Sequence, residues 1–185
     1  MMVAAVVAIW PRSEPAPAPP EESTQTTPDL TKARADAALP ACPSAENGLA
    51  DLRGITVECL ADGASTNVAV KGPALVNMWA TWCPPCKAEL PVLAEYAAQP
   101  DAVPVIGLAV ESRPADALEL LTALKVKLPS FLDEQGRARQ QLRAIALPAS
   151  YLVGADGTVT LIENPRVFRS VDEVRQAVGQ GGAHG

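Results

Sequence analysis

The sequence predicts an α/β fold in which a mixed β-sheet is flanked by helices. Two apolar runs, residues 74–80 and 103–110, are rich in branched side chains and short enough to be buried strands. Segments with helical periodicity follow both runs, and a pattern typical of a β-hairpin with a closing helix ends the chain. Strands that alternate with helices in this way favour a layered α/β sandwich.

On the N-terminal side of the first buried strand, the sequence indicates a short helix and a hairpin. Residues 30–40 are compatible with a short helix. Segments 55–60 and 67–71 combine apolar and polar residues on either side of Asp62-Gly63, a pair that favours tight turns. We therefore expect a β-hairpin added before the central sheet.

The later elements follow from prolines, caps and turn residues. The helix that opens at the Cys-Pro-Pro-Cys stretch is expected to run to about residue 98. Pro114 suits the first turn of the next helix, and Ser170 with Glu173 forms a capping-box pattern for the last one. The other expected elements are helices at 114–126, 136–145 and 170–178, a strand at 129–133, and a hairpin with strands at 150–153 and 158–163.

Residues 1–40 differ in composition from the rest of the chain. Residues 1–10 are apolar, but a bilayer-spanning helix needs about 20 such residues, and no basic segment precedes them. They fit the end of a signal anchor that begins upstream, a weak signal core or an unstructured start. Residues 11–29 are rich in Pro, Ala, Glu, Ser and Thr, which predicts a disordered linker. We expect a tethered or exported domain at 41–180, with a flexible tail at 181–185.

Charge and composition exclude several classes of function. The formal net charge is −6, which argues against nucleic acid as a partner. The single histidine, His184, lies near the C-terminus, so His-based triads and His-rich metal sites are excluded. We expect neither a metal nor another cofactor.

The four cysteines carry the main chemical signal. A structural zinc site requires two close pairs of ligands, and here only Cys83 and Cys86 are close in sequence. A pair placed between a buried strand and a helix start favours a redox dithiol over zinc or over a structural disulfide in a turn. The other two cysteines, Cys42 and Cys59, are 17 residues apart.

The start of a helix explains the Cys-Pro-Pro-Cys order. Unpaired N–H groups and the helix dipole stabilise a thiolate at Cys83, which we expect to be the exposed nucleophile, with Cys86 one turn inside as the resolving thiol. Pro84 and Pro85 suit the first turn and leave the Cys86 N–H as the main donor to the Cys83 sulfur. A less stabilised thiolate favours the disulfide and indicates a reductant.

The segment LVNMWATWCPPCKAELP, residues 75–91, resembles the active-site segment of the thioredoxin superfamily. It is most similar to the TlpA/ResA-like group of membrane-tethered, extracytoplasmic thiol–disulfide oxidoreductases, and the resemblance covers about residues 50–180. It implies a thioredoxin-like sandwich with a central sheet of four or five strands and an added N-terminal β-hairpin.

The resemblance also assigns roles outside the Cys-x-x-Cys pair. Pro91 corresponds to the proline that kinks the active-site helix of the family, and Pro148 to the cis-proline that faces the dithiol. Leu147 stands where relatives often carry Thr, Val or Ile, at the residue whose backbone pairs with substrate. The expected substrate contacts are Trp82, Pro84, Pro85, Leu147 and Pro148.

Two polar positions distinguish the group from cytoplasmic thioredoxins. Asn77 replaces their buried aspartate, and Glu89 lies three residues after Cys86, as in the TlpA/ResA-like pattern. One helical turn would let Glu89 reach the resolving thiol, directly or through water. The alternative is that Glu89 is an ordinary solvated charge on the helix.

In an oxidising compartment, Cys42 and Cys59 are expected to form a structural disulfide. Closing a loop of about 18 residues would stabilise the fold by about 3 kcal/mol. A second redox or relay pair and free thiols remain as alternatives. Stable disulfides also favour a location outside the cytoplasm.

These observations predict an extracytoplasmic thiol–disulfide oxidoreductase. Cys83 would attack a disulfide of an exported protein, and Cys86 would resolve the mixed disulfide. A membrane electron donor would restore the dithiol, and the family suggests apocytochrome c as one client. The alternatives are a thiol oxidase that forms disulfides in exported proteins and a redox-inactive binding or chaperone module.

Overall fold

The protein was analysed as a computed structural model that describes residues 1–2, 30–44 and 48–181. Most of the apolar start, the Pro-rich segment 11–29 and the tail with His184 lie outside the described residues. None of the helices in the described ranges has the length and apolar character needed to cross a membrane.

A single mixed sheet of seven strands forms the centre of the described domain, in the order β2-β1-β5-β4-β3-β6-β7. Strands β3, β4 and β5 run parallel, whereas β1, β2, β6 and β7 pair antiparallel with their neighbours. The strands are β1 (Thr56–Cys59), β2 (Ser65–Asn67), β3 (Ala74–Trp79), β4 (Val105–Val110), β5 (Ser130–Asp133), β6 (Ala149–Val153) and β7 (Val159–Leu161).

The two apolar runs of the sequence form the centre of this sheet, as predicted. Every residue of β3 and β4 is buried, which is typical of strands covered on both faces. Their parallel pairing aligns the carboxyl ends of both strands, with Trp79 opposite Ala109. The loops that follow β3 and β4 therefore emerge at the same end of the sheet.

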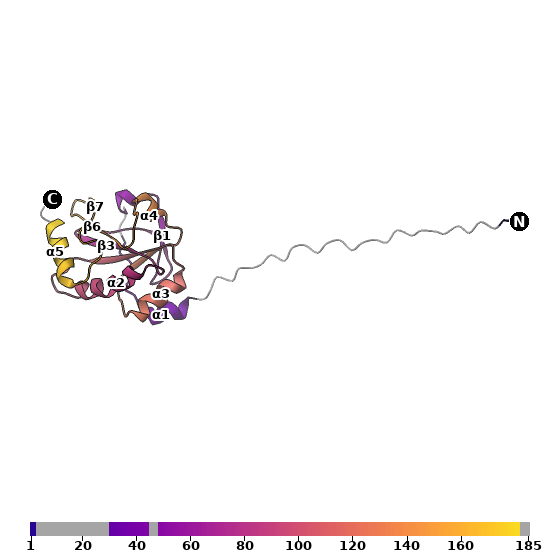
Figure 1. The fold of residues 1–185 in the computed structure, drawn as a ribbon, viewed down its shortest axis with the longest axis horizontal. Coiled ribbons are helices and arrows are strands. Elements are labelled where there is room, and N and C mark those ends of the chain that lie inside the picture. The colour runs from indigo at the N-terminus through magenta and orange to yellow at the C-terminus, as the bar shows by residue number, and fades with distance from the viewer. Residues whose placement is uncertain (3–29, 45–47, 182–185) are drawn as a thin grey trace.

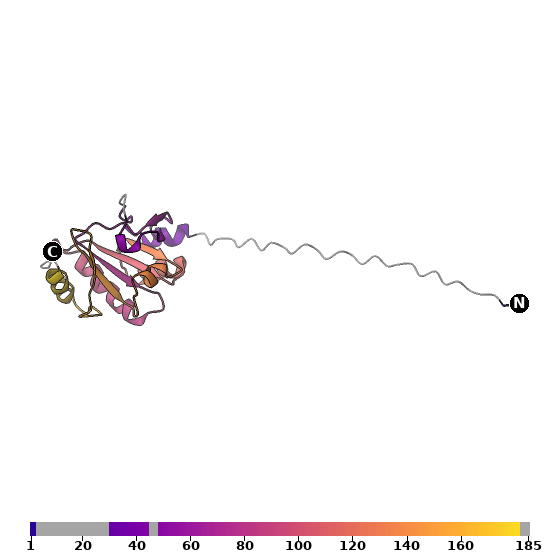
Figure 2. The ribbon, with the colours of Figure 1, turned by 90° about the horizontal axis from the view of Figure 1, so that it is seen from above.

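Most of the helices form a row beside the sheet (Figures 1 and 2). α1 packs against α3, and α2 packs against α5. α4 instead contacts the short helix η1 and lies away from this row in Figure 1. The helices are α1 (Thr31–Ala37), η1 (Ala50–Leu52), α2 (Pro84–Ala97), α3 (Pro114–Ala123), α4 (Arg137–Gln141) and α5 (Val171–Gly181).

Residues before the expected boundary at 41 also pack against the described domain. Leu30 and Ala37 are buried at the two ends of α1, and Lys127 donates from its ammonium group to the Ala37 carbonyl. The predicted short helix is therefore present, and its apolar side makes it part of the domain.

The N-terminal hairpin is present, but its second strand differs from the prediction. β2 is Ser65–Asn67, with Thr56 opposite Asn67, instead of residues 67–71. Val68, Ala69 and Val70 are buried, and the Val68 carbonyl accepts from the Leu49 N–H outside the β1–β2 ladder. Their apolar character reflects burial against the core and not strand pairing.

The hairpin extends the central sheet. β1 pairs antiparallel with β5, placing Glu58 opposite Leu132, so the five strands β5-β4-β3-β6-β7 gain two more at one edge. This arrangement confirms the predicted thioredoxin-like sandwich with an added N-terminal hairpin.

Several helix ends differ from the expected pattern, and α3 ends at Ala123 instead of residue 126. α4 stops at Gln141 because the chain leaves the helical conformation at Arg143, which has a φ of 52°. At the start of α5, the Ser170 hydroxyl accepts from the Glu173 N–H (3.3 Å), but the Glu173 carboxylate accepts from the Arg169 N–H (2.6 Å). The side chain of Glu173 thus reaches one residue beyond the partner that a capping box predicts.

Candidate active site

Cys83 and Cys86 lie where β3 passes into α2. β3 ends at Trp79, and Cys83 is the N-cap residue of α2, with Pro84 in the first helical position. Their sulfurs are joined in a disulfide with an S–S distance of 2.04 Å. The sequence pattern of strand, Cys-x-x-Cys pair and helix start is therefore present in three dimensions.

The Cys83 sulfur has one hydrogen-bond donor among the described residues. The Cys86 N–H donates to it across 3.3 Å. Pro84 and Pro85, which are exposed, have no N–H to offer. The Cys86 N–H, the donor predicted from the sequence, is therefore the one that binds the Cys83 sulfur.

Cys83 is less exposed than the sequence suggested. Only 4% of its surface is accessible, compared with 0% for Cys86, so the expected order holds but Cys83 is nearly buried. In the disulfide its sulfur is bonded to Cys86, and both residues belong to the hydrophobic core. Trp82, immediately before Cys83, is 53% exposed.

Pro148 approaches this end of the sheet from the other side. The Leu147–Pro148 peptide bond is cis, and β6 begins at the next residue. Ala149 pairs with Met78 near the carboxyl end of β3, so Pro148 lies at the same end of the sheet as the Cys83 loop. Pro148 is buried and Leu147 is half-buried.

Glu89 is fully buried, which excludes a solvated charge on the helix surface. Its carboxylate accepts from the Asn77 side chain (2.8 Å) and from the Phe168 N–H (2.7 Å). Burial raises the pKa of Glu89 from its ordinary 4.5 to about 7, and the bonds from Phe168 and Asn77 oppose that rise. Neither described partner of Glu89 is a cysteine sulfur.

Asn77 links Glu89 to β6. Its amide nitrogen donates to Glu89 and also to the Ser150 hydroxyl (3.0 Å), whereas its amide oxygen is buried without a described partner. The amide thus donates to two acceptors on different elements. Ser150 and the Phe168 N–H are members of this network that the sequence did not reveal, because they are far from Glu89 along the chain.

The sequence predicted Trp82 as a substrate contact but did not reveal its two partners at this end of the sheet, Glu111 and Arg139. The Trp82 indole N–H donates to the Glu111 carbonyl (3.0 Å), and Arg139 forms an ion pair with the Glu111 carboxylate (2.7 Å). The Arg139 guanidinium lies over the Trp82 ring, 5.8 Å from its centre. Only the geometry brings these three residues together.

The structure joins Cys42 and Cys59 in the second disulfide, with an S–S distance of 2.06 Å. Cys59 is the last residue of β1 and is buried, whereas Cys42 is half-buried in the segment after α1. The bridge therefore ties the N-terminal segment to the hairpin.

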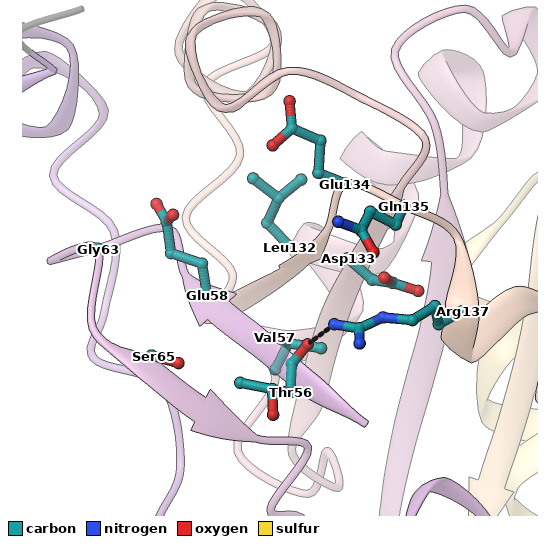
Figure 3. A pocket seen from close by; sticks show the side chains of 10 residues that line it. All are labelled: Thr56, Val57, Glu58, Gly63, Ser65, Leu132, Asp133, Glu134, Gln135 and Arg137. Carbon is teal, nitrogen blue, oxygen red and sulfur yellow. Dashed lines mark hydrogen bonds between the residues drawn. The ribbon is translucent and has the colours of Figure 1, made fainter. Parts of the chain in front are cut away.

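The surface of the described residues has hollows outside the cysteine pair. One, of about 210 Å³, lies between the hairpin and the segment after β5, where Arg137 donates to the Thr56 carbonyl (Figure 3). Another, of about 420 Å³, is bordered by Trp82 and Lys87 and by α3 residues, among them Glu119. Within the described ranges no cluster of three or more His, Cys, Asp or Glu side chains could hold a metal ion.

The sheet order, the Cys-x-x-Cys pair at a helix start and the cis-proline opposite it define a thioredoxin-fold protein. Residues 51–162 match the AhpC/TSA family, and the chain belongs to this family. This result confirms the resemblance to the thioredoxin superfamily.

Relatives support the assignment to thiol–disulfide chemistry. The chain is 37% identical over 98 residues to the thiol:disulfide interchange protein CycY of Rhizobium leguminosarum bv. viciae, which is 52% of each chain. It is 31% identical over 113 residues to the soluble secreted antigen MPT53 of Mycobacterium tuberculosis, or 61% of this chain and 64% of that one. The chain thus spans about half to two thirds of the length of these relatives.

A solved structure shows the same fold. It is that of a secreted Mycobacterium tuberculosis disulfide oxidoreductase homologous to Escherichia coli DsbE. The TM-score is 0.60 at 29% identity, and the match covers 70% of this chain and 97% of the other. The matched part is therefore almost the whole of the solved domain.

Proposed function

We propose that the protein is an extracytoplasmic thiol–disulfide oxidoreductase that reduces disulfides of exported proteins. The observation that carries the proposal is the Cys83–Cys86 pair at the start of α2, with cis Pro148 at the same end of the sheet. The relatives named as interchange proteins and disulfide oxidoreductases support this chemistry.

In the proposed reaction, the reduced form begins with a Cys83 thiolate. It attacks one sulfur of the client disulfide, and the other client sulfur leaves as a thiolate. The Cys86 thiolate then attacks the Cys83 sulfur and releases the second client thiolate. Two electrons pass from the protein to the client, and the product is the Cys83–Cys86 disulfide that the structure contains.

Glu89 is the proposed acceptor for the proton of the Cys86 thiol. It is placed one helical turn after Cys86, it is buried, and its pKa of about 7 suits proton exchange near neutrality. A water or a shift of the side chain would have to complete the path, since the described bonds of Glu89 go to Asn77 and Phe168.

The direction of transfer follows from how few donors stabilise the Cys83 thiolate. With Pro84 and Pro85 lacking N–H groups, one described donor faces the sulfur. We expect a reduction potential nearer to thioredoxin's, about −270 mV, than to the strongly oxidising value of about −120 mV. A titration of the Cys83–Cys86 pair in glutathione buffers tests this, and a value above about −180 mV would favour the oxidase instead.

Location and partners are part of the same proposal. The secreted relatives, together with the apolar and Pro-rich residues 1–29, support a domain that is exported or tethered to the membrane. A membrane electron donor would then re-reduce the dithiol, and apocytochrome c is one client that this proposal includes. Alkaline phosphatase fused after residue 40, with the native upstream start, should be active. An inactive phosphatase fusion, beside an active fusion at the same residue to a reporter that works in the cytoplasm, would contradict this location.

Reduction of insulin by dithiothreitol separates the enzyme from a redox-inactive binding module. The wild-type protein should accelerate insulin precipitation, and Cys83→Ser should abolish the acceleration. A wild-type protein without activity, although folded and with its dithiol accessible, would favour the binding module.

A further inference from the structure

We propose that Arg139 is a positioning residue that fixes the exposed indole of Trp82 beside Cys83 and thereby sets the affinity for protein clients. The proposal rests on the function proposed above and deepens it. Trp82 would contact the client, whereas Arg139 would act through Trp82.

Arg139 connects three segments at the dithiol end of the sheet. Its terminal nitrogen pairs with the Glu111 carboxylate (2.7 Å), and its Nε donates to the Ala144 carbonyl (3.1 Å). Its guanidinium also lies 5.8 Å from the centre of the Trp82 ring, within the range of a cation–π contact. One planar group thus joins the loops after β3 and β4 to the segment that leads to Pro148.

Trp82 is also held by Glu111, the residue that pairs with Arg139. Its indole N–H donates to the Glu111 carbonyl (3.0 Å), while the carboxylate of Glu111 holds Arg139. The ring is therefore fixed at its edge by a hydrogen bond and on its face by the guanidinium. Although 53% of Trp82 is exposed, it has specific partners and is not a freely rotating surface side chain.

The backbone around Arg139 adopts conformations that such contacts are needed to maintain. Glu111 and Arg143 both have positive φ values, 48° and 52°, which are unfavourable for residues other than glycine. At Gly136, with a φ of 68°, an added Cβ would lie 2.8 Å from the Glu111 side chain. The Glu111 side chain therefore packs closely against the turn that begins α4.

A fixed, exposed aromatic ring next to the nucleophile lowers the entropy lost when a client binds. Loss of Arg139 should therefore weaken client binding and leave the chemistry at sulfur unchanged. The KM for a protein disulfide should rise, whereas kcat, the reduction potential and the rate with a small disulfide should stay the same. A purely structural role would instead change stability without this division between KM and kcat.

The test compares Arg139→Gln and Arg139→Lys with a matched control, Arg137→Gln. Arg137 lies on the same helix, but its described bond goes to the Thr56 carbonyl, in the hollow between the hairpin and the segment after β5. Each variant is assayed with insulin and with a small aromatic disulfide. Anisotropy decay of Trp82 is measured in a Trp10→Phe background, which leaves buried Trp79 as the other emitter.

For Arg139→Gln we expect the KM for insulin to rise about tenfold, with kcat within about twofold of the wild type. The Trp82 ring should show faster motion. Arg139→Lys keeps the charge but lacks the planar guanidinium that can bind Glu111 and Ala144 together. Its KM should therefore lie between those of the wild type and Arg139→Gln. Arg137→Gln should match the wild type in every assay.

An unchanged KM in Arg139→Gln, with insulin reduction intact in the wild type, would overturn this inference and leave the proposed function standing. An inactive wild type would instead overturn the proposed function. If Arg139→Gln does not fold, the same criterion applies to Arg139→Lys, for which a KM equal to that of the wild type counts against the inference.

Discussion

The protein contains two disulfides that differ in what surrounds them. Cys83–Cys86 spans three residues at the start of α2, whereas Cys42–Cys59 spans 17 residues and ties the segment after α1 to the end of β1. The first has a helix N-terminus, a backbone donor to its sulfur and a buried acid one turn away. The second is placed at the end of a β-strand, not at the start of a helix.

The two environments favour different roles for the two disulfides. A helix N-terminus stabilises the thiolate that exchange requires, and a buried acid can take a proton from the partner thiol. A bridge across a longer loop mainly restricts the unfolded chain. We therefore assign exchange to Cys83–Cys86 and stability to Cys42–Cys59 as a proposal that substitutions can test.

The largest expected effect is on catalysis by the first pair. Cys83→Ser should reduce disulfide exchange to background, because it removes the nucleophile. Cys86→Ser should still allow attack but not resolution, so a mixed disulfide through Cys83 should accumulate with the client. Non-reducing gels with mass spectrometry would detect it. Equal trapping by both single variants would contradict the assigned order of attack.

The double substitution Cys42→Ala/Cys59→Ala should affect stability and spare exchange. We expect the free energy of unfolding to fall by about 3 kcal/mol, measured by denaturant titration with the Cys83–Cys86 pair kept oxidised. Insulin reduction should continue at temperatures where the variant is folded. A folded variant that has lost exchange would show that the second pair relays electrons.

Glu89 should make stability depend on pH near neutrality. Its pKa is about 7 in the folded protein against an ordinary 4.5, so the native state binds this proton more tightly than the unfolded state. The stabilisation is therefore complete below about pH 4.5 and is lost as the pH rises to about 7, with a decrease of about 2 kcal/mol between pH 5 and pH 7.

Glu89→Gln should remove that pH dependence, which denaturant titrations at several pH values would measure. It should also slow resolution and shift the pH profile of Cys86 alkylation, because the proposed proton acceptor is gone. Asp116, a partly exposed acid paired with Arg113, offers a matched control as Asp116→Asn. An unchanged thiol profile in Glu89→Gln would remove Glu89 from the mechanism.

The smallest effect is expected at Ser150, the outer member of the network beneath the first pair. Ser150→Ala removes one acceptor of the Asn77 amide and leaves its bond to Glu89. We expect a loss of about 1 kcal/mol in the free energy of unfolding, with exchange retained. A loss of exchange in the folded variant would show that Asn77 must be held from both sides.

The sequence predicted the features that local patterns determine. The largely apolar segments that form β3 and β4 and the Cys-Pro-Pro-Cys start of α2 were all recognisable, because each depends on residues close together in the chain. The second hairpin strand was misplaced because Val68 and Val70 are apolar for burial and not for pairing.

Contacts between distant segments could not be predicted. The Phe168 N–H, one hydrogen-bond donor to Glu89, comes from a segment far from Glu89 along the chain. Arg139 likewise contacts Glu111 and Trp82 only because the fold brings distant segments together. A Glu or Arg in a helical sequence pattern does not indicate which distant residues it will contact. The sequence therefore indicated which residues supply the sulfur chemistry but not how the surrounding side chains hold them.

The position of α1 has a practical consequence for any shortened form of the protein. Composition alone suggests trimming the chain near residue 41, the expected start of the domain. Such a cut would remove the buried residues Leu30 and Ala37, uncover the side of α3 that α1 covers, and leave Glu58 without its partner Arg34. A chain that starts just before Leu30 keeps this cover and is the better choice for crystallisation.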